Sequence, residues 1–355
     1  MERPQLNHLL AINTSKLINV RASLTYGLDS DKPPTVSELT GLPAASAPAK
    51  AIKMLFSKKV FQIKLLGLNQ KDEIVFNRIY ESDSFGGLDF KIDQNVNEIE
   101  KILIFEISSH PGIEHYVGSY IPIKMEASSK IVISDFDKTL VDTRYSNAKE
   151  VYQSLNNPLS YFPSIEKSIE IFKDYISRGF YPFIVTASPH FYEHAIRDWL
   201  YQNSIYTSGI FLKDYRSFFS FFDGVLTPKD IKTQGFYKLN HIISILLMTG
   251  IPKELALIGD GFESDPIIYL TVKKIMLNNS PPWNLWNSLR EESVFNLTNR
   301  QNSHFLNKIY KLHGLLKNAP PCDVKIHIRH PLGHLTTHYP DFLKGSQEVI
   351  QVYQA

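Results

Sequence analysis

The chain has little cysteine, no long apolar run and almost no net charge. Its 355 residues contain one cysteine, Cys322, which excludes an internal disulfide and is consistent with a reducing compartment. No apolar stretch approaches the length of a membrane-spanning helix, and the first residues lack the pattern of a secretory signal peptide. Lys and Arg number 38 against 36 Asp and Glu, so no overall charge favours nucleic acid as a partner. We therefore expect a cytoplasmic protein that does not bind nucleic acid.

The most informative segment is residues 130–143, KIVISDFDKTLVDT. Its β-branched run at 131–133 predicts a buried parallel strand, which ends at two carboxylates one residue apart, Asp135 and Asp137. Ligands bind at the carboxyl ends of strands in α/β sheets, so these acids are candidate site residues. Because two acids this close repel each other, a divalent cation would offset the charge, with one acid ionised and the other able to carry a proton. The alternative is a strand followed by an acidic turn.

Asp-x-Asp-x-Thr after such a strand, with Thr139 as its last residue, resembles the nucleophile motif of the haloacid dehalogenase superfamily of phosphotransferases. A second apolar strand is predicted at 180–186, and Thr186 at its end matches the Ser or Thr of the superfamily's second motif. Ser188 is expected to cap a following helix, in which Pro189 suits the first position. A hydroxyl beside free helix N–H groups can hold a phosphate. The alternative is that Thr186 only caps a turn.

A third apolar run, 255–258, leads to Asp260 and then Asp265, which resemble the superfamily's fourth motif. That motif completes a metal site in the superfamily. Mg²⁺ prefers oxygen ligands and keeps several waters, so Asp135, Asp260 and the main-chain carbonyl of Asp137 would suffice to hold it. Asp265 would bind the cation through water or orient a lysine, unless it is only a charge that the helix dipole favours.

The superfamily's third motif is a lysine. Lys238 precedes an apolar periodic run at 239–246, so it is expected near the start of a helix that Gly250 ends. Lys229 and Lys232 lie shortly before it and are alternatives. Lys238 could also be an ordinary solvated helix residue.

The motifs together resemble a narrower group, the actin-patch-associated phosphatidate phosphatase family and its bacterial relatives, over residues 60–275. A β-rich segment comes first, followed by Val-Thr-Ala-Ser-Pro, Ser-Gly-Ile-Phe-Leu-Lys-Asp-Tyr and Gly-Asp-x-x-x-x-Asp-Pro-x-x-Tyr. Two positions depart from the family pattern: Lys138 stands where the family usually has Asp, and Tyr237 where it tends to have His. The residue types of the site are kept, so the departures concern the lipid substrate and not the reaction.

The resemblance implies a Mg²⁺-dependent phosphomonoester hydrolase that acts on phosphatidate-like lipid through an aspartyl-phosphate. Asp135 would attack phosphorus, and Asp137 would protonate the leaving alkoxide and then accept a proton from water. The phosphoryl group and substrate would be held by Thr186, Lys238, Thr139 and Ser188, and the cation by Asp135, Asp137, Asp260 and Asp265. The alternatives are a phosphatase for a soluble nucleotide, sugar phosphate or polynucleotide end, and a catalytically silent interaction module with the same fold.

The expected fold class is α/β. Over residues 129–282 strands and helices alternate, which predicts a Rossmann-like parallel sheet with crossover helices, similar to the haloacid dehalogenase fold without a large cap. Short strands separated by turn residues predict a small β-sandwich-like domain over 60–128. Residues 1–59 are an N-terminal segment that is partly loop, and residues 283–355 are a helical or irregular C-terminal extension.

The remaining strands of the parallel sheet are expected at 209–215 and 273–277. Between the first two motifs there is room for little more than one crossover helix, given typical element lengths. Many members of the superfamily insert a cap domain there. The resemblance therefore implies an open site, which suits a large substrate or one presented at a surface.

Two further patterns have both a functional and a structural interpretation. Residues 50–64 interleave lysines with apolar residues, so they could make peripheral contact with an anionic membrane, but a surface helix or turn is favoured. The spacing of the C-terminal histidines allows a metal site, although Pro331 and Gly333 interrupt any helix that could align them. Packing or surface roles are favoured for these histidines, which are His327, His330, His334 and His338.

Overall fold

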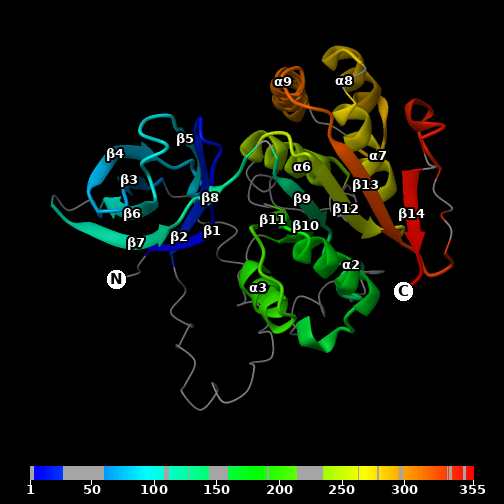
Figure 1. Ribbon diagram of the computed structural model, residues 1–355, viewed down its shortest axis with the longest axis horizontal. Coiled ribbons are helices and arrows are strands. Elements are labelled where there is room, and N and C mark those ends of the chain that lie inside the picture. The colour runs from blue at the N-terminus through cyan, green and yellow to red at the C-terminus, as the bar shows by residue number, and fades with distance from the viewer. Residues whose placement is uncertain are drawn as a thin grey trace. The chain divides into compact units, whose positions relative to one another are not determined.

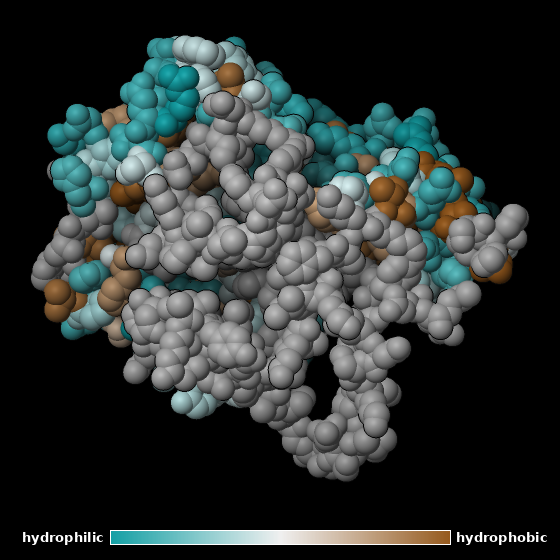
Figure 2. Space-filling model, turned by 180° about the vertical axis from the view of Figure 1, so that it is seen from behind, coloured by the Kyte–Doolittle hydropathy of each residue, from teal (hydrophilic) through white to brown (hydrophobic). Residues whose placement is uncertain are grey.

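The computed structural model describes residues 4–26, 60–107, 112–126, 128–143, 159–189, 192–213, 235–262, 264–277, 280–295, 299–333, 335, 338–346 and 349–355. Among these, the residues up to Glu126 form one compact unit and those from residue 128 onward form a second (Figure 1). No helix in the described ranges is long and apolar enough to cross a membrane. The coloured part of the surface in Figure 2 is largely hydrophilic, with small apolar areas among the polar ones.

The first unit consists of two small sheets that share one hydrophobic core. Side chains of β3 and β6 alternate between buried and more exposed positions, as expected for strands with one face on a core. Ile18 and Val20 from one sheet and Ile63 and Ile104 from the other belong to the same apolar cluster. The strand orders are β5 (Gly87–Ile92), β2 (Ile18–Tyr26), β1 (Pro4–Asn13), β8 (Ile123–Lys124), and β4 (Ile74–Glu81), β3 (Gln62–Leu68), β6 (Lys101–Ile107), β7 (Glu114–Tyr120).

All neighbouring strands of the first unit are antiparallel except β1 and β8. No strand was predicted at 4–26, where β1 and β2 pair with each other. An irregularity between Asn7 and Leu10 shifts their register, and His8 has a positive φ of 53°. Such a bulge interrupts the alternation of apolar and polar residues, which removes the pattern that identifies a strand in a sequence.

The second unit is an α/β domain built on a six-stranded parallel sheet. The predicted parallel sheet with crossover helices is confirmed. The strand order is β11 (Gly209–Lys213), β10 (Phe180–Pro189), β9 (Lys130–Ser134), β12 (Glu254–Asp260), β13 (Asp323–Arg329), β14 (Ile350–Tyr353). The helices are η3 (Leu159–Tyr161), α2 (Glu166–Ser177), α3 (Glu193–Gln202), α6 (Gly235–Thr249), α7 (Asp265–Met276), α8 (Pro282–Glu291), α9 (Asn299–Leu316) and η5 (Asp341–Leu343).

Two predictions about the second unit are wrong. The strand predicted at 273–277 is largely the end of α7, because Asp265 and Pro266 start a helix and a short apolar run alone does not separate helix from strand. The segment 283–355 is not only helical and irregular, since it supplies β13 and β14 to the sheet. In β13 the apolar residues Val324, Ile326 and Ile328 alternate with polar residues and are buried, as in a strand that packs one face against the core.

Several predicted features lie wholly or partly outside the described residues. Residues 50–59 of the basic segment, Lys229, Lys232 and His334 are among them. The described part of the basic segment begins at Val60, and Phe61 is buried in the core of the first unit. Phe61 is therefore not a surface residue that could meet a membrane.

The segment with Asp135 and Asp137 is anchored in the hydrophobic core of the second unit. Phe136, which stands between Asp135 and Asp137, is fully buried, and its ring meets Trp199 of α3 edge to face at a centroid distance of 5.2 Å. Phe172 of α2 belongs to the same cluster. Packing of Phe136 into this core fixes the main chain on which both carboxylates stand.

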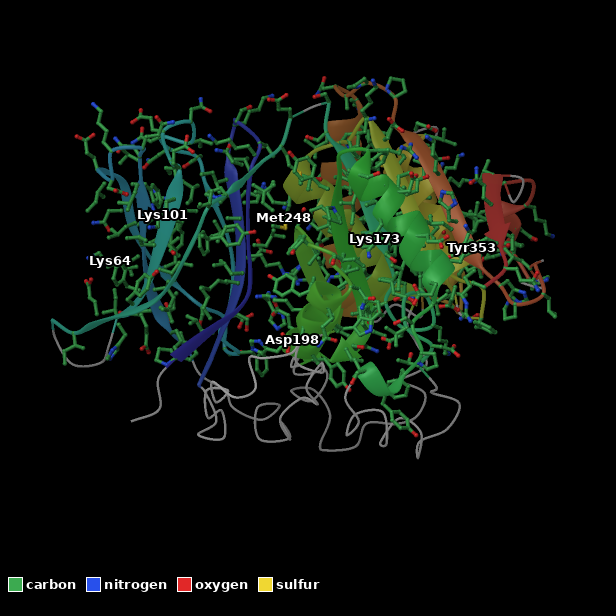
Figure 3. The ribbon with its side chains drawn as sticks, turned by 60° about the horizontal axis from the view of Figure 1, so that its bottom comes forward. Lys64, Lys101, Lys173, Asp198, Met248 and Tyr353 are labelled. Atoms are coloured by element: carbon green, nitrogen blue, oxygen red, sulfur yellow. The ribbon has the colours of Figure 1, made fainter. Side chains whose placement is uncertain are left out.

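Replacing Phe172 by Ala is expected to lower the free energy of unfolding by about 3–5 kcal/mol, because the buried ring leaves a cavity. The matched control is Lys173→Ala, on the solvent side of the same helix (Figure 3), which should change it by no more than about 0.5 kcal/mol. Urea unfolding followed by circular dichroism measures both values. Equal losses in the two variants would contradict the assignment of Phe172 to the core.

Candidate functional site

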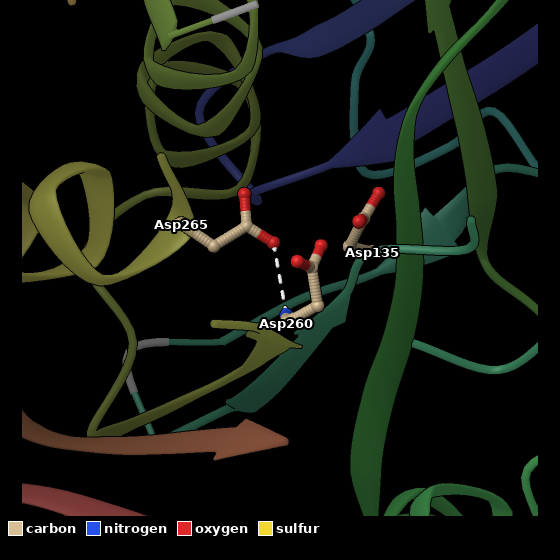
Figure 4. A group of neighbouring side chains, drawn as sticks. All are labelled: Asp135, Asp260 and Asp265. Carbon is tan, nitrogen blue, oxygen red and sulfur yellow. Dashed lines mark hydrogen bonds between the residues drawn. The ribbon is translucent and has the colours of Figure 1, made fainter. Parts of the chain in front are cut away.

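Three carboxylates from distant parts of the chain meet at the carboxyl edge of the parallel sheet (Figure 4). Asp135 follows β9, Asp260 ends the neighbouring strand β12, and Asp265 begins α7. One oxygen of each lies within 4.8 Å of the others. The side chains are at most 2% exposed. The sequence motifs predicted this edge as the site, and the structure brings all three acids to it.

Main-chain contacts hold these carboxylates in place. The amide of Asp135 donates to the carbonyl of Ile258 at 2.9 Å, which ties the end of β9 to β12. The amide of Asp260 donates to Oδ2 of Asp265 at 3.3 Å, and that of Phe262 donates to Oδ1 of Asp260 at 2.7 Å. At position 259 a Cβ would lie 2.4 Å from Oδ2 of Asp265. Only glycine at that position allows Asp265 to come so close.

Lys238 is the cation of this cluster. It lies in the first turns of α6 and is 2% exposed, with Nζ 3.0 Å from Oδ2 of Asp135 and 2.5 Å from Oδ1 of Asp265. It is therefore not a solvated helix residue. Its rivals in sequence, Lys229 and Lys232, lie outside the described residues.

The donor set of the cluster fits a divalent cation. Asp135, Asp260 and Asp265 supply three carboxylates against the single ammonium of Lys238, so these four side chains together are negative. Several buried carboxylates in one place are unfavourable unless they are compensated, and hard cations such as Mg²⁺ or Ca²⁺ prefer oxygen ligands of this kind. The three aspartates therefore form a group that could hold a metal ion.

Asp137 accepts hydrogen bonds from three hydroxyls. Its Oδ1 accepts a hydrogen bond from Thr143 at 3.0 Å, and its Oδ2 accepts from Thr186 and from Ser188, both at 2.8 Å. Thr143 was not predicted as a site residue. The turn that Lys138 N–H closes onto the carbonyl of Val141 brings Thr143 back toward Asp137, and a threonine shortly after the second acid was the only signal in the sequence.

The helix predicted to begin at Ser188 and Pro189 does not begin there. Strand β10 continues through Pro189, which pairs with Lys213 of β11, and α3 starts only after Tyr192. Pairing along the sheet has overridden the local preference for a helix cap. Thr186 and Ser188 nevertheless reach the predicted site, where their hydroxyls bind Asp137. Ser188 also donates its amide to Oγ1 of Thr186 at 3.1 Å.

Thr139, Tyr192 and Tyr269 also lie next to the aspartates of the site. Oγ1 of Thr139 lies 3.5 Å from Oδ2 of Asp135, at the long end of a hydrogen bond. Tyr269 donates to the carbonyl of Ile258 at 3.0 Å, and burial raises its pKa well above the usual value. Burial, and next the charge of Asp137, raise the pKa of Tyr192 as well. Both phenols therefore stay neutral and do not titrate near neutral pH.

The C-terminal histidines have separate neighbours. Nε2 of His327 lies 2.7 Å from the hydroxyl of Tyr175, and burial lowers the pKa of this histidine. The ring of His330 packs against Phe262 at 5.7 Å between centroids. In the described ranges, the aspartate cluster is the only group of His, Cys, Asp or Glu side chains arranged to hold a metal ion.

Comparison with known proteins gives one family match. Residues 130–279 match the family described as phosphatidate phosphatase APP1, catalytic domain, as the motifs predicted. No curated protein matches the chain. A structure of a Pnkp1/Rnl/Hen1 complex is 12% identical with a TM-score of 0.25, and the match covers 44% of this chain and half of that one. A Parabacteroides merdae β-glucuronidase is 9% identical with a TM-score of 0.26, over 92% of this chain and 34% of that one. These two scores are too low to carry an argument.

Proposed function

Because residues 130–279 match the family described as phosphatidate phosphatase APP1, catalytic domain, we propose that the chain is a Mg²⁺-dependent phosphomonoester hydrolase that acts on phosphatidate-like lipid. The observation that carries this proposal is the buried cluster of Asp135, Asp260 and Asp265 around Lys238. All four residues lie in the matched segment. The acids and the lysine are the groups that a phosphoryl transfer through an aspartate requires.

Asp135 is the nucleophile in this proposal. A phosphomonoester is dianionic and repels an anion, so the reaction depends on positive charge around phosphorus and on precise positioning. Lys238 has its Nζ 3.0 Å from Oδ2 of Asp135, which favours the ionised carboxylate and places a cation beside the transferring group. A carboxylate oxygen forms the new bond to phosphorus, and the bond to the alcohol oxygen breaks, which leaves an aspartyl-phosphate.

Asp137 is the proton donor and acceptor. It gives a proton to the leaving alkoxide in the first step and takes one from the attacking water in the second, so the acid is regenerated. Its contacts with Thr143, Thr186 and Ser188 support this role, because a hydroxyl both donates and accepts hydrogen bonds. The three hydroxyls can therefore hold Asp137 in either protonation state. Thr186 and Lys238 would also hold the phosphoryl oxygens, with Thr139 and Ser188 beside them.

Mg²⁺ is the cation proposed for the aspartate cluster. Asp135, Asp260 and the main-chain carbonyl of Asp137 would hold it. Asp265 would serve mainly to orient Lys238, which is supported by the 2.5 Å contact between them. When bound, the cation supplies positive charge that neutralises the phosphoryl oxygens.

A soluble substrate is the second candidate. Lys138 and Tyr237 differ from the residues that the family usually has at these positions. This difference favours a substrate whose alcohol is not a lipid but whose phosphomonoester is hydrolysed in the same way. A nucleotide, a sugar phosphate or a polynucleotide end would then replace the lipid. A cytoplasmic location belongs to the lipid proposal, as does peripheral membrane contact through the lysines of residues 50–64, in which the buried Phe61 takes no part.

Phosphate release from phosphatidate vesicles, p-nitrophenyl phosphate, sugar phosphates and nucleotides, each with Mg²⁺ and with EDTA, tests the proposal. We expect Mg²⁺-dependent release from p-nitrophenyl phosphate and from phosphatidate, with phosphatidate preferred over the soluble metabolites. Release from soluble metabolites alone would move the substrate to the second candidate. No release from any phosphomonoester would leave an interaction module with the same fold, and release that persists in EDTA would refute the metal requirement.

A further inference from the structure

Arg329 lies at the carboxyl end of β13, beyond the segment that matches the family. In the register of the parallel sheet it stands opposite Asp260. Its side chain is only 9% exposed. A cation that is withdrawn from solvent at this position has to be held by acceptors of the same unit, and the contacts of Arg329 show which acceptors these are.

The side chain of Arg329 reaches the turn that follows Asp137. Its Nη1 donates to the carbonyl of Lys138 at 2.8 Å and lies 3.6 Å from Oδ1 of Asp142. Its Nε donates to the carbonyl of Ala355 at 3.2 Å. The guanidinium therefore joins Ala355, which follows β14, to the turn that follows Asp137.

The main chain of Arg329 reaches the other side of the site. Its carbonyl accepts a hydrogen bond from the amide of Gly261 at 2.8 Å, directly after Asp260. At Gly261 an added Cβ would lie 2.9 Å from the ring of His330, so the two segments are in close contact. One residue is thus bonded to both of the loops that carry site carboxylates.

Lys138 is a position where the main chain needs support. Its φ is +59°, in the left-handed region that residues with a Cβ rarely adopt. Asn and Asp adopt this region more readily than Lys, because their side chains can bond to the nearby main chain. The amide of Lys138 donates to Val141 at 2.7 Å, and its carbonyl is bound by Arg329. The main-chain amide and carbonyl of Lys138 are therefore both held by hydrogen bonds to other residues.

We propose that Arg329 is a positioning residue of the active site. It holds the turn at Lys138 against the loop of Asp260, and so keeps Asp137 in place relative to Asp135 and the cation cluster. The inference rests on the proposed function, because it assigns the consequence of this contact to the proton transfer by Asp137. It also makes the C-terminal segment part of the catalytic unit, although that segment lies outside the matched residues.

The kinetic test uses Arg329→Lys, which keeps the charge but loses the planar fork of donors. The substrates are an alkyl phosphate, whose leaving group needs the proton from Asp137, and p-nitrophenyl phosphate, whose leaving group needs it little. We expect kcat to fall about 10²-fold for the alkyl phosphate and about 10-fold or less for p-nitrophenyl phosphate, with KM changed by less than about threefold. The matched control is Lys325→Met, near the other end of the same strand, which should leave both rates unchanged.

A rescue experiment separates positioning from a general structural role. Lys138→Asn should favour the left-handed turn, so the combination of Lys138→Asn with Arg329→Lys should recover part of the lost kcat. Equal losses for the two substrates, or no recovery in the double variant, would overturn the proposal. If Arg329→Lys does not fold, Arg329→Gln, which keeps one donor for the Lys138 carbonyl, is assayed in the same way.

Hydrogen exchange gives a readout that does not depend on activity. Amides of the peptide 136–143 should exchange faster in Arg329→Lys than in the parent protein and should be unchanged in Lys325→Met. Unaltered exchange would refute the anchoring by Arg329 whatever the substrate is. A parent protein without phosphatase activity, but with faster exchange in the variant, would refute the proposed function and leave the anchoring contact in place.

Discussion

Asp135→Asn is expected to abolish phosphatase turnover, with a loss on the order of 10⁴-fold or more in kcat. Asparagine keeps the shape of the side chain but has no anionic oxygen to attack phosphorus. Lys238 keeps its contact with Asp265, so the variant should fold with a thermal midpoint close to that of the parent. Phosphate release under saturating Mg²⁺ and a thermal melt measure the two properties.

The matched control for this variant is Asp323→Asn, an exposed acid at the amino end of β13, which should keep full activity. Beryllium fluoride, which mimics a phosphoryl group on a carboxylate, should bind next to Asp135 in the parent and should not bind the Asn variant. Turnover that persists in Asp135→Asn, or fluoride bound at another acid, would remove Asp135 from the role of nucleophile.

The second large effect is expected for Lys238→Met, which changes stability as well as rate. Loss of the ammonium leaves the carboxylates of Asp135 and Asp265 buried without their shared cation. Removing one partner from a buried ion pair typically costs about 3–5 kcal/mol of unfolding free energy. We therefore expect a loss of that size in EDTA, together with a fall in kcat of at least about 10²-fold.

Mg²⁺ should restore part of the stability of Lys238→Met, and more than it adds to the parent, because a cation in the aspartate cluster replaces some of the missing charge. Urea unfolding of both proteins with EDTA and with Mg²⁺ measures this difference. Lys173→Met, an exposed lysine on α2, is the control for the substitution itself. Unchanged stability of Lys238→Met in EDTA would show that Lys238 does not compensate the carboxylates.

The acids and the lysine of the site could be predicted because each is marked by a local pattern. An apolar run before Asp135 and another before Asp260 identify strands, and parallel strands bring their carboxyl ends to one edge. Lys238 is marked by the periodic run that follows it. The roles of Asp260, Asp265 and Lys238 came from the resemblance to the superfamily's motifs, and the alternation of strands and helices explains why their segments meet.

The features that could not be predicted are those that depend on contacts between segments far apart in the sequence. Ser188 and Pro189 have the residue types of a helix start, but β10 continues through both of them and Pro189 pairs with Lys213 of β11. The contact of Arg329 with the carbonyl of Lys138 joins residues 191 positions apart and involves the main chain, which has no sequence signature. Strand β1 escaped prediction because an irregularity between Asn7 and Leu10 breaks its alternation.

The central place of β9 in the parallel sheet determines when the active site can form during synthesis. β9 lies between β10 and β12, and β12 begins only at Glu254. A ribosome releases β9 long before β12 exists, so one edge of a strand rich in β-branched residues stays open meanwhile. Open strand edges pair with other chains, and parallel pairing between distant segments is slow. We therefore expect the nascent chain to be most prone to pairing with other chains until β12 has emerged.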